Sequence, residues 1–385
     1  MIIYVCFWVF SILASLFVKR KIDLWVFLFC IFLFVGLRFE TGFDWPVYKD
    51  IFSRFQESFQ VSDVMSIYHT HNQELGFLVF FGALAQILPS YEYVQAIFTV
   101  FLLYSFVKLA SAIHVSHKAL ALSLSLFLSF FLLPVAFSTV RQSLAISFFN
   151  IALMYYISGR RLPSIVFCLL AILAHTSAII YVGVLVVNWF VMNNRRVVSA
   201  FFLIFAALLF YAALLAVLEL NTYFPPAVGS KISYYKDVAI SSGLGLKSLA
   251  LMLFAFLIGL HASMMKGSQP ICDNRVTTLR NFIVVFSALA VASGFFTVLR
   301  DRIFYELMLL YGIYIATLRV DVKFFVVPVV FSFGLAYQMV FFLSYPSVIV
   351  FVPYQNAMLV KLTGNKIDGQ KRSQLFMESF KNLYR

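Results

Sequence analysis

Apolar runs follow one another along almost the whole chain, and most approach the length that a helix needs to cross a bilayer. A crossing takes about 20 apolar residues, so 385 residues could supply roughly a dozen helices. Of the residues, 63% are hydrophobic and only 12% are charged, whereas a soluble domain is about 45–50% apolar. We therefore predict an all-α polytopic membrane protein with about 11–13 transmembrane helices. The runs are 1–18, 22–37, 74–89, 92–113, 119–137, 141–157, 162–174, 177–192, 197–218, 247–265, 278–298, 303–318 and 322–344.

This many crossings leaves little chain for a separate soluble domain. Residues 1–385 are predicted to form one membrane-embedded domain, with a basic C-terminal tail at 355–385. The first run precedes Lys19-Arg20-Lys21, the reverse order of a secretory signal peptide, so we expect it to be retained as a helix. The net charge of +13 falls mostly in short loops between runs, where it indicates topology and not nucleic-acid binding.

Loop charges predict the side of the membrane that each loop faces. The positive-inside rule puts Gly159–Arg161, Asn193–Arg196 and Lys266–Arg275 in the cytoplasm. Counting crossings from these loops puts the loops 38–73 and 219–246 on the opposite side. The same count brings His175 and a set of unusual arginines to that outer face.

The count meets one conflict. Three apolar runs lie between Arg38 and Arg141, whereas two ends on the same side require an even number of crossings. One run is therefore expected to be re-entrant or not to span, as backbone that lines a cavity can do. The candidates are 74–89, which is short, and 119–137, which Pro134 interrupts.

The loop 38–73 is predicted to contain an amphipathic helix on the outer membrane surface. Pro46 suits the first turn of a helix. Apolar residues then recur at helical spacing, which is typical of a surface-lying helix: Val47, Ile51, Phe55 and Phe59.

Arginines at the ends of apolar runs are the most unusual polar residues of the chain. Arg141 lies between two long runs, where the desolvation cost of the charge demands a partner or a water-filled cavity. Arg38, Arg300 and Arg302 end other runs at the same predicted face, which suggests an anionic substrate there. An arginine at a helix end can also be a snorkelling anchor, and Arg300 could instead pair with Asp301.

No metal or cofactor motif is present in the sequence. His69-Thr70-His71 and the pair His114 and His117 each offer two imidazoles without an obvious third and fourth ligand. The sequence also lacks an Asp-x-Asp pair, a phosphate-binding Gly-rich loop and a Gly-x-Ser-x-Gly nucleophile. We therefore predict neither a metal site nor a cofactor.

Six short motifs occur in order along nearly the whole chain. The first is Arg-Phe-x-x-Gly-x-Asp-x-x-x-Tyr, formed by Arg38, Phe39, Gly42, Asp44 and Tyr48. The others are Glu74-Leu75-Gly76-Phe77, Val140-Arg141-Gln142-Ser143-Leu144-Ala145-Ile146-Ser147, Ala174-His175-Thr176-Ser177-Ala178, Arg302-Ile303-Phe304-Tyr305 and Val352-Pro353-Tyr354. In this order they resemble the EpsG-like branch of the Wzy O-antigen and exopolysaccharide polymerases.

The resemblance implies a glycosyltransferase of the bacterial inner membrane with its active site facing the periplasm. Such an enzyme moves a growing glycan from undecaprenyl diphosphate onto the non-reducing end of a new undecaprenyl-diphosphate-linked repeat unit. The lipid bilayer, a chain-length regulator and a flippase of the same pathway are the implied partners. Guanidinium groups match phosphate oxygens bidentately, so Arg141, Arg302, Arg38 and Arg300 would hold the leaving diphosphate without a metal.

The acceptor hydroxyl must lose a proton as it attacks. His175, Glu74 and Asp44, in that order, are the candidate general bases at the outer face. Each has a structural alternative, because His175 could cap a helix and the two carboxylates could satisfy free amides at helix starts. The remaining candidate substrate-binding residues are Tyr48, Gln142 and Tyr305.

Two other classes of protein stay open. A flippase or other transporter of lipid-linked oligosaccharides would also have many helices and buried arginines, but would be expected to show repeat symmetry between its halves, which we do not find in the sequence. Another polyprenyl-dependent glycosyltransferase or an O-antigen ligase would share the outer-face site. The glycan pattern after gene deletion separates these classes.

Overall fold

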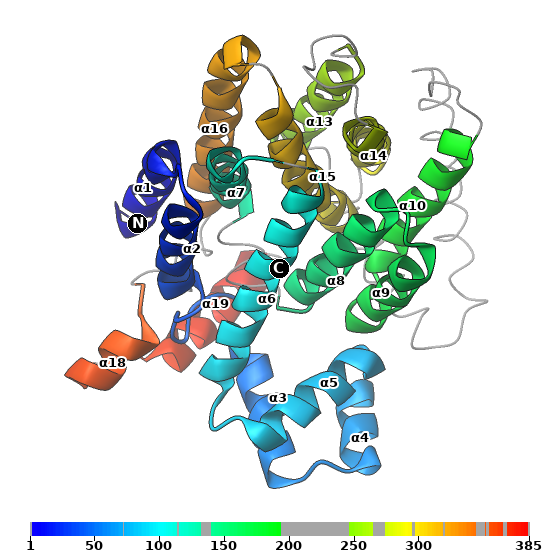
Figure 1. Ribbon diagram of the computed structural model, residues 1–385. Coiled ribbons are helices and arrows are strands. Elements are labelled where there is room, and N and C mark those ends of the chain that lie inside the picture. Colours follow the sequence, from blue (N-terminus) through cyan, green and yellow to red (C-terminus); the bar gives the residue numbers. More distant parts are fainter. Residues whose placement is uncertain are drawn as a thin grey trace. The chain divides into compact units, whose positions relative to one another are not determined.

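The computed structural model describes residues 2–71, 73–113, 115–131, 140–193, 246–264, 274–294, 297–318, 320–343, 351, 354–364 and 368–383. Within these ranges the protein consists of sixteen helices, with no strand beyond one isolated bridge between Arg38 and Asn356 (Figure 1). The predicted all-α polytopic membrane fold is confirmed. The run 197–218 and nearly all of the loop 219–246 lie outside the described residues.

The helices form two compact units, Met1–Thr176 with Asp321–Arg385, and Ser177–Val320. The first unit holds α1 (Ile2–Phe17), α2 (Lys21–Val35), α3 (Trp45–Glu57), α4 (Val61–His71), α5 (Leu75–Ile87), α6 (Tyr91–Ala112), α7 (His117–Phe131), α8 (Val140–Ile157), α9 (Arg161–Ala174), all but the first residue of α16 (Val320–Leu343), α18 (Ala357–Thr363) and α19 (Gly369–Leu383). The second unit holds α10 (Ala178–Asn193), α13 (Leu246–Met264), α14 (Asn274–Ala292) and α15 (Thr297–Thr317).

The helices coincide with the apolar runs of the sequence because a bilayer offers the backbone no hydrogen-bond partners. A chain inside it must satisfy its own amides, and a helix does so within one segment. Three described helical segments are both long and apolar enough to cross a membrane: Tyr91–Ala112, Asn274–Ala292 and Val322–Val340. Other apolar helices, such as α1 and α9, are shorter.

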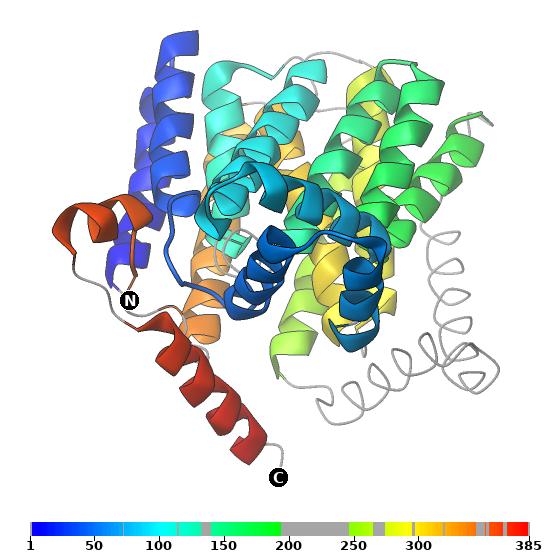
Figure 2. The same cartoon turned by 90° about the horizontal axis from the view of Figure 1, so that it is seen from below.

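A tight turn makes α8 and α9 an antiparallel pair. Gly159 adopts a left-handed φ of 77°, which a residue without a Cβ reaches at little cost. The chain reverses there, and α9 returns along α8, as both views show (Figures 1 and 2). Because α8 spans 18 residues, about 27 Å at 1.5 Å per residue, Arg141 and Arg160 lie at opposite ends of the pair. The C-terminal end of α9 brings His175 back to the end where Arg141 lies.

Helix α5 fits the predicted non-spanning run. It has 13 residues, about 20 Å, against a hydrocarbon core about 30 Å thick. It packs on α3 and α4, which lie beside it in Figure 1. For the other candidate run, Pro134 and its neighbours lie outside the described residues.

The predicted helix of the 38–73 loop is α3, with Pro46 in its first turn. Ile51 and Phe55 of its apolar face are buried, but Val47 is 39% exposed. Phe59 lies beyond the end of the helix. The buried face is centred on Tyr48 and Phe52, whose rings lie 5.6 Å from Phe77 and 6.1 Å from Phe81. Helix α5, and not the bilayer alone, therefore covers this face.

Candidate functional site

The carboxylate of Glu74 is the centre of a polar cluster in the first unit. Its Oε1 lies 2.8 Å from Nδ1 of His175 and accepts hydrogen bonds from the backbone N–H of Thr176 at 3.2 Å and the Thr176 hydroxyl at 2.9 Å. Its Oε2 forms a close ion pair with Nη1 of Arg141. The side chain is 7% exposed. Glu74 occupies the N-cap position of α5 but makes no side-chain cap bond, because its oxygens serve the cluster instead.

Arg141 projects into the cluster from the first turn of α8. Its Nε donates to the hydroxyl of Tyr48 on α3 at 2.8 Å, and its Nη1 donates to Glu74. Nη2 has no hydrogen-bond partner among the described residues. The side chain is 20% exposed, so the cluster engages two of the three guanidinium nitrogens and leaves the donors of the third for another group.

The cluster determines the charge of Glu74. Burial by itself would raise the pKa of this carboxyl, but the hydrogen bond from His175 and the positive charge of Arg141 outweigh burial and hold the pKa well below its usual range. A depressed pKa stabilises the fold above the unfolded value of about 4.3, and that stability is lost as the pH falls toward the folded pKa. Glu74 is therefore a carboxylate at neutral pH and a poor proton acceptor.

Close packing of α5 against the end of α9 brings Glu74 to His175. Gly76 makes this approach possible, since an added Cβ would lie 2.6 Å from Cβ of Leu173 and 2.8 Å from its carbonyl oxygen. The second of these contacts is with backbone, which cannot turn aside. Gly76 therefore sets the distance between the two helices.

We expect Gly76→Ala to separate α5 from α9 and to reduce activity by about tenfold, the scale of loss when a catalytic group is displaced by less than 1 Å. Gly183→Ala in α10 is the matched control, because a Cβ there would meet nothing within 4 Å. The measurement is the activity of the protein in membranes at equal protein abundance. Equal activity of the two variants would contradict the role of this contact.

Arg38 lies beside the first turn of α8. It is buried, and its Nη1 donates to the carbonyl of Val35 at 2.9 Å. With Gln95 of α6 and with Val140 and Ser143 of α8 it lines a small cavity. Burial lowers the pKa of Arg38 to about 10, which leaves the group protonated at neutral pH. Two arginines thus flank the start of α8.

The other candidates of the first unit have distinct places. Asp44 occupies the N-cap position of α3 but makes no side-chain cap bond, and its charge acts on Tyr48 and Arg141. Burial raises the pKa of Tyr48, and the carboxylates of Asp44 and Glu74 add to this effect, so Tyr48 stays a neutral hydrogen-bonding group. Gln142 is buried in α8.

Three candidates belong to the second unit. Arg300 is buried and pairs with Oδ1 of Asp301 through Nε at 3.0 Å and Nη2 at 2.6 Å. The pairing that the sequence left open is thus present. The carbonyl of Arg302 accepts a hydrogen bond from Tyr181 at 2.9 Å, and Tyr305 is buried. Arg302 has a half-buried side chain.

Thr176 is the member of the cluster that sequence reasoning missed. It donates two hydrogen bonds to Glu74, and the available signal was its position directly after His175. No group of three or more His, Cys, Asp or Glu side chains that could hold a metal ion occurs within the described ranges.

The helices and the Glu74 cluster define a polytopic all-α membrane protein with a buried carboxylate–arginine–histidine site. A family model described as the EpsG family matches residues 21–356, and the chain belongs to the EpsG family. This membership supports a role in polysaccharide biosynthesis as a membrane glycosyltransferase-like polymerase. No curated protein and no solved structure matches the chain.

Proposed function

We propose that the protein is a polysaccharide polymerase that transfers a growing glycan from undecaprenyl diphosphate to a new undecaprenyl-diphosphate-linked repeat unit. The observation that carries the proposal is the Glu74 cluster, in which one carboxylate orients both a guanidinium and an imidazole. Family membership supports the general class of this reaction.

The imidazole of His175 suits the attack of the acceptor hydroxyl, and the guanidinium of Arg141 suits the departure of the diphosphate. The acceptor hydroxyl oxygen attacks the anomeric carbon of the growing chain, and its proton passes to His175. The bond from that carbon to the diphosphate oxygen breaks, and the electron pair leaves with undecaprenyl diphosphate. The donors of Arg141 stabilise the developing negative charge, because charge-assisted hydrogen bonds are strongest where charge accumulates. Arg38 is a further candidate for this contact, Arg300 and Arg302 remain predictions from the sequence, and the proposed reaction needs no metal.

In this proposal Glu74 positions its neighbours and is not the base. Its bond to Nδ1 of His175 fixes the orientation of the ring, as a carboxylate does for a catalytic imidazole in other acyl and glycosyl transfers. Asp44 remains the alternative base, since its charge reaches the same cluster.

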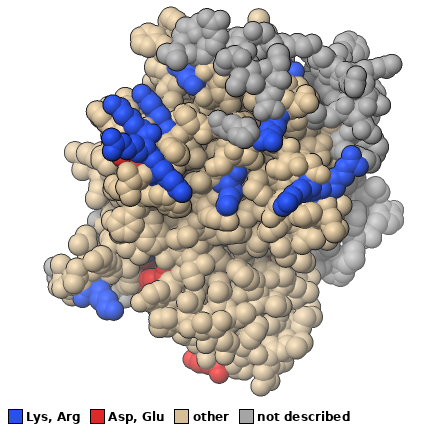
Figure 3. Space-filling view, viewed as in Figure 1, with Lys and Arg blue, Asp and Glu red and all other residues tan. Residues whose placement is uncertain are grey.

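The arrangement of α8 and α9 supports a periplasmic site in the inner membrane. Arg160 and Arg161 lie at the end of the helix pair opposite to Arg141 and His175. Positively charged loops face the cytoplasm, which supports the opposite side of the membrane for the cluster. Basic side chains outnumber acidic ones on the face drawn in Figure 3, in line with the net charge of +13.

Deleting the gene tests the function. Loss of polymer with a single repeat unit still joined to the final acceptor is the expected result. Loss of every repeat unit from that acceptor would identify a flippase or a ligase instead. Plasmid-borne wild type must restore the polymer, whereas an unchanged polymer in the deletion strain would contradict the proposal.

A further inference from the structure

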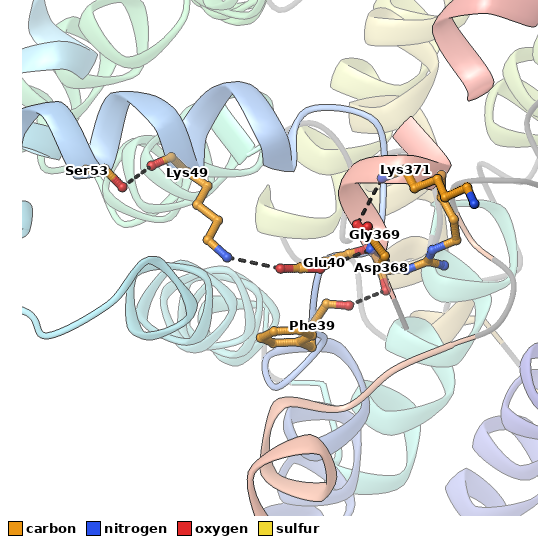
Figure 4. Close-up of polar contacts among 9 residues, drawn as sticks. Phe39, Glu40, Lys49, Ser53, Asp368, Gly369 and Lys371 are labelled. Atoms are coloured by element: carbon orange, nitrogen blue, oxygen red, sulfur yellow. Dashed lines mark hydrogen bonds and ion pairs between the residues drawn. The ribbon is translucent and has the colours of Figure 1, made fainter. Parts of the chain in front are cut away.

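Glu40 joins the C-terminal helix to the loop that leads into the site. Its Oε2 accepts a hydrogen bond from the backbone N–H of Gly369, the first residue of α19, at 3.1 Å. Nη2 of Arg372 donates to the Glu40 carbonyl at 2.8 Å. Its Oε1 pairs with Nζ of Lys49 on α3 at 3.1 Å. Figure 4 shows this carboxylate between the two helices.

The contact of α19 with Glu40 leaves no spare room. A Cβ at Gly369 would lie 2.5 Å from Cβ of Glu40 and 2.8 Å from its Oε2. A glycine at the first position therefore lets the positive end of the helix dipole meet the carboxylate directly. Glu40 itself has a φ of 44°, a left-handed conformation that a side chain other than glycine adopts only where its surroundings impose it.

Lys49 carries the contact onward to the candidate site. It lies next to Tyr48, whose hydroxyl accepts the hydrogen bond from Arg141. The ammonium group is also 5.7 Å from the ring centroid of Phe39 and 5.6 Å from that of Trp45, close enough for cation–π attraction. Glu40 thus connects the start of α3, through Lys49, to the start of α19, through Gly369.

The contacts that α19 makes with Glu40 come from a part of the chain beyond the family match. That match ends at residue 356, whereas α19 begins at Gly369. The two segments are far apart in sequence, since Glu40 and Gly369 are separated by 329 positions. The hydrogen bonds from Gly369 and Arg372 to Glu40 are therefore long-range contacts, which the sequence of the loop 38–44 does not predict.

We propose that α19 is a clamp on the loop 38–44, and that Glu40, Gly369 and Arg372 are positioning residues that hold Tyr48 against Arg141. This inference rests on the proposed function for its catalytic consequence. The clamp acts through the start of α3 and touches neither the substrate nor the reacting atoms.

The test compares Gly369→Ala and Arg372→Gln with wild type in the full-length protein. Two quantities are measured: hydrogen exchange of the amides in 38–44, and kcat and KM for extension of synthetic lipid-linked repeats. We expect exchange in the loop to rise about tenfold as local opening becomes easier. We expect kcat to fall about tenfold with KM within twofold, because orientation is lost while binding is retained.

Gly183→Ala is the matched control, and exchange in α14 shows whether a variant is globally unfolded. Unchanged loop exchange in both folded variants would overturn the clamp. Faster loop exchange with an undiminished kcat would overturn its positioning role. A wild-type protein without extension activity would instead refute the proposed function, and the exchange measurement would still decide whether α19 holds the loop.

Discussion

Arg141→Lys is expected to lower chain extension by about 100-fold, the loss that follows removal of one well-placed donor from a charged transition state. Lysine keeps the positive charge and can still reach Glu74, but it cannot donate to Tyr48, Glu74 and a phosphate oxygen from one rigid plane. The geometry of the fork, and not its charge alone, is what the cluster fixes.

The measurement uses purified protein and synthetic lipid-linked repeats at equal enzyme concentration. Arg54→Lys is the matched control, because Arg54 also pairs with a carboxylate, Asp50, at 3.0 Å, but its side chain is 52% exposed. Exposed pairs contribute about 0–1 kcal/mol, so this variant should keep its activity. Arg300→Lys should lose less than Arg141→Lys, since Arg300 directs both Nε and Nη2 to the adjacent Asp301, whereas Arg141 joins Glu74 and Tyr48 in the Glu74 cluster. Full extension by Arg141→Ala at normal abundance would remove Arg141 from the mechanism.

His175→Ala should abolish chain extension while the protein still binds lipid-linked substrate. In the proposed mechanism the imidazole acts on the acceptor hydroxyl, whereas binding depends on contacts of the diphosphate with the arginines. Glu74→Gln should lower kcat and leave KM nearly unchanged, because the amide cannot hold both His175 and Arg141 as the carboxylate does.

His69→Ala is the control for this experiment, since His69 lies on the exposed side of α4. If His175 only ends α9, its variant should instead show lower abundance, with a cost of about 1 kcal/mol typical of a lost cap. Normal extension by His175→Ala would shift the role of base to Asp44. EDTA should leave extension unchanged, and inhibition by EDTA would contradict a metal-free reaction.

The membrane helices were predictable because each depends only on its own stretch of sequence. A long apolar run in lipid must form a helix, since lipid offers the backbone no hydrogen-bond partners. The run 141–157 became α8 within one residue at its start. The loop 38–73 was harder, since its amphipathic pattern predicts a helix but does not say what covers it. Helix α5 covers the buried face of α3. Two of its glycines allow close approach to other segments: Gly82 lies against Phe59, just beyond the end of α3, and Gly76 lies against Leu173 of α9.

The site was predictable as a set of residues but not as a set of contacts. Arg141, Glu74, His175 and Tyr48 were all candidates, yet Glu74 and Arg141 are 67 residues apart and Glu74 and His175 are 101 apart. The charge of a side chain and the position of its motif in the sequence do not predict which other side chain it will contact. The pair of Arg300 and Asp301 was accessible to sequence reasoning because the two residues are adjacent.

An internal carboxylate competes with the substrate for the guanidinium of Arg141. Because Glu74 already neutralises one positive charge, a ligand with a single negative charge gains little by approaching Arg141. A diphosphate brings two adjacent charges and several acceptor oxygens, so it can engage the remaining donors without displacing Glu74. If the proposed function holds, the resting ion pair weakens the binding of small singly charged anions to Arg141 and favours a lipid diphosphate, which has enough acceptor oxygens to use the remaining donors.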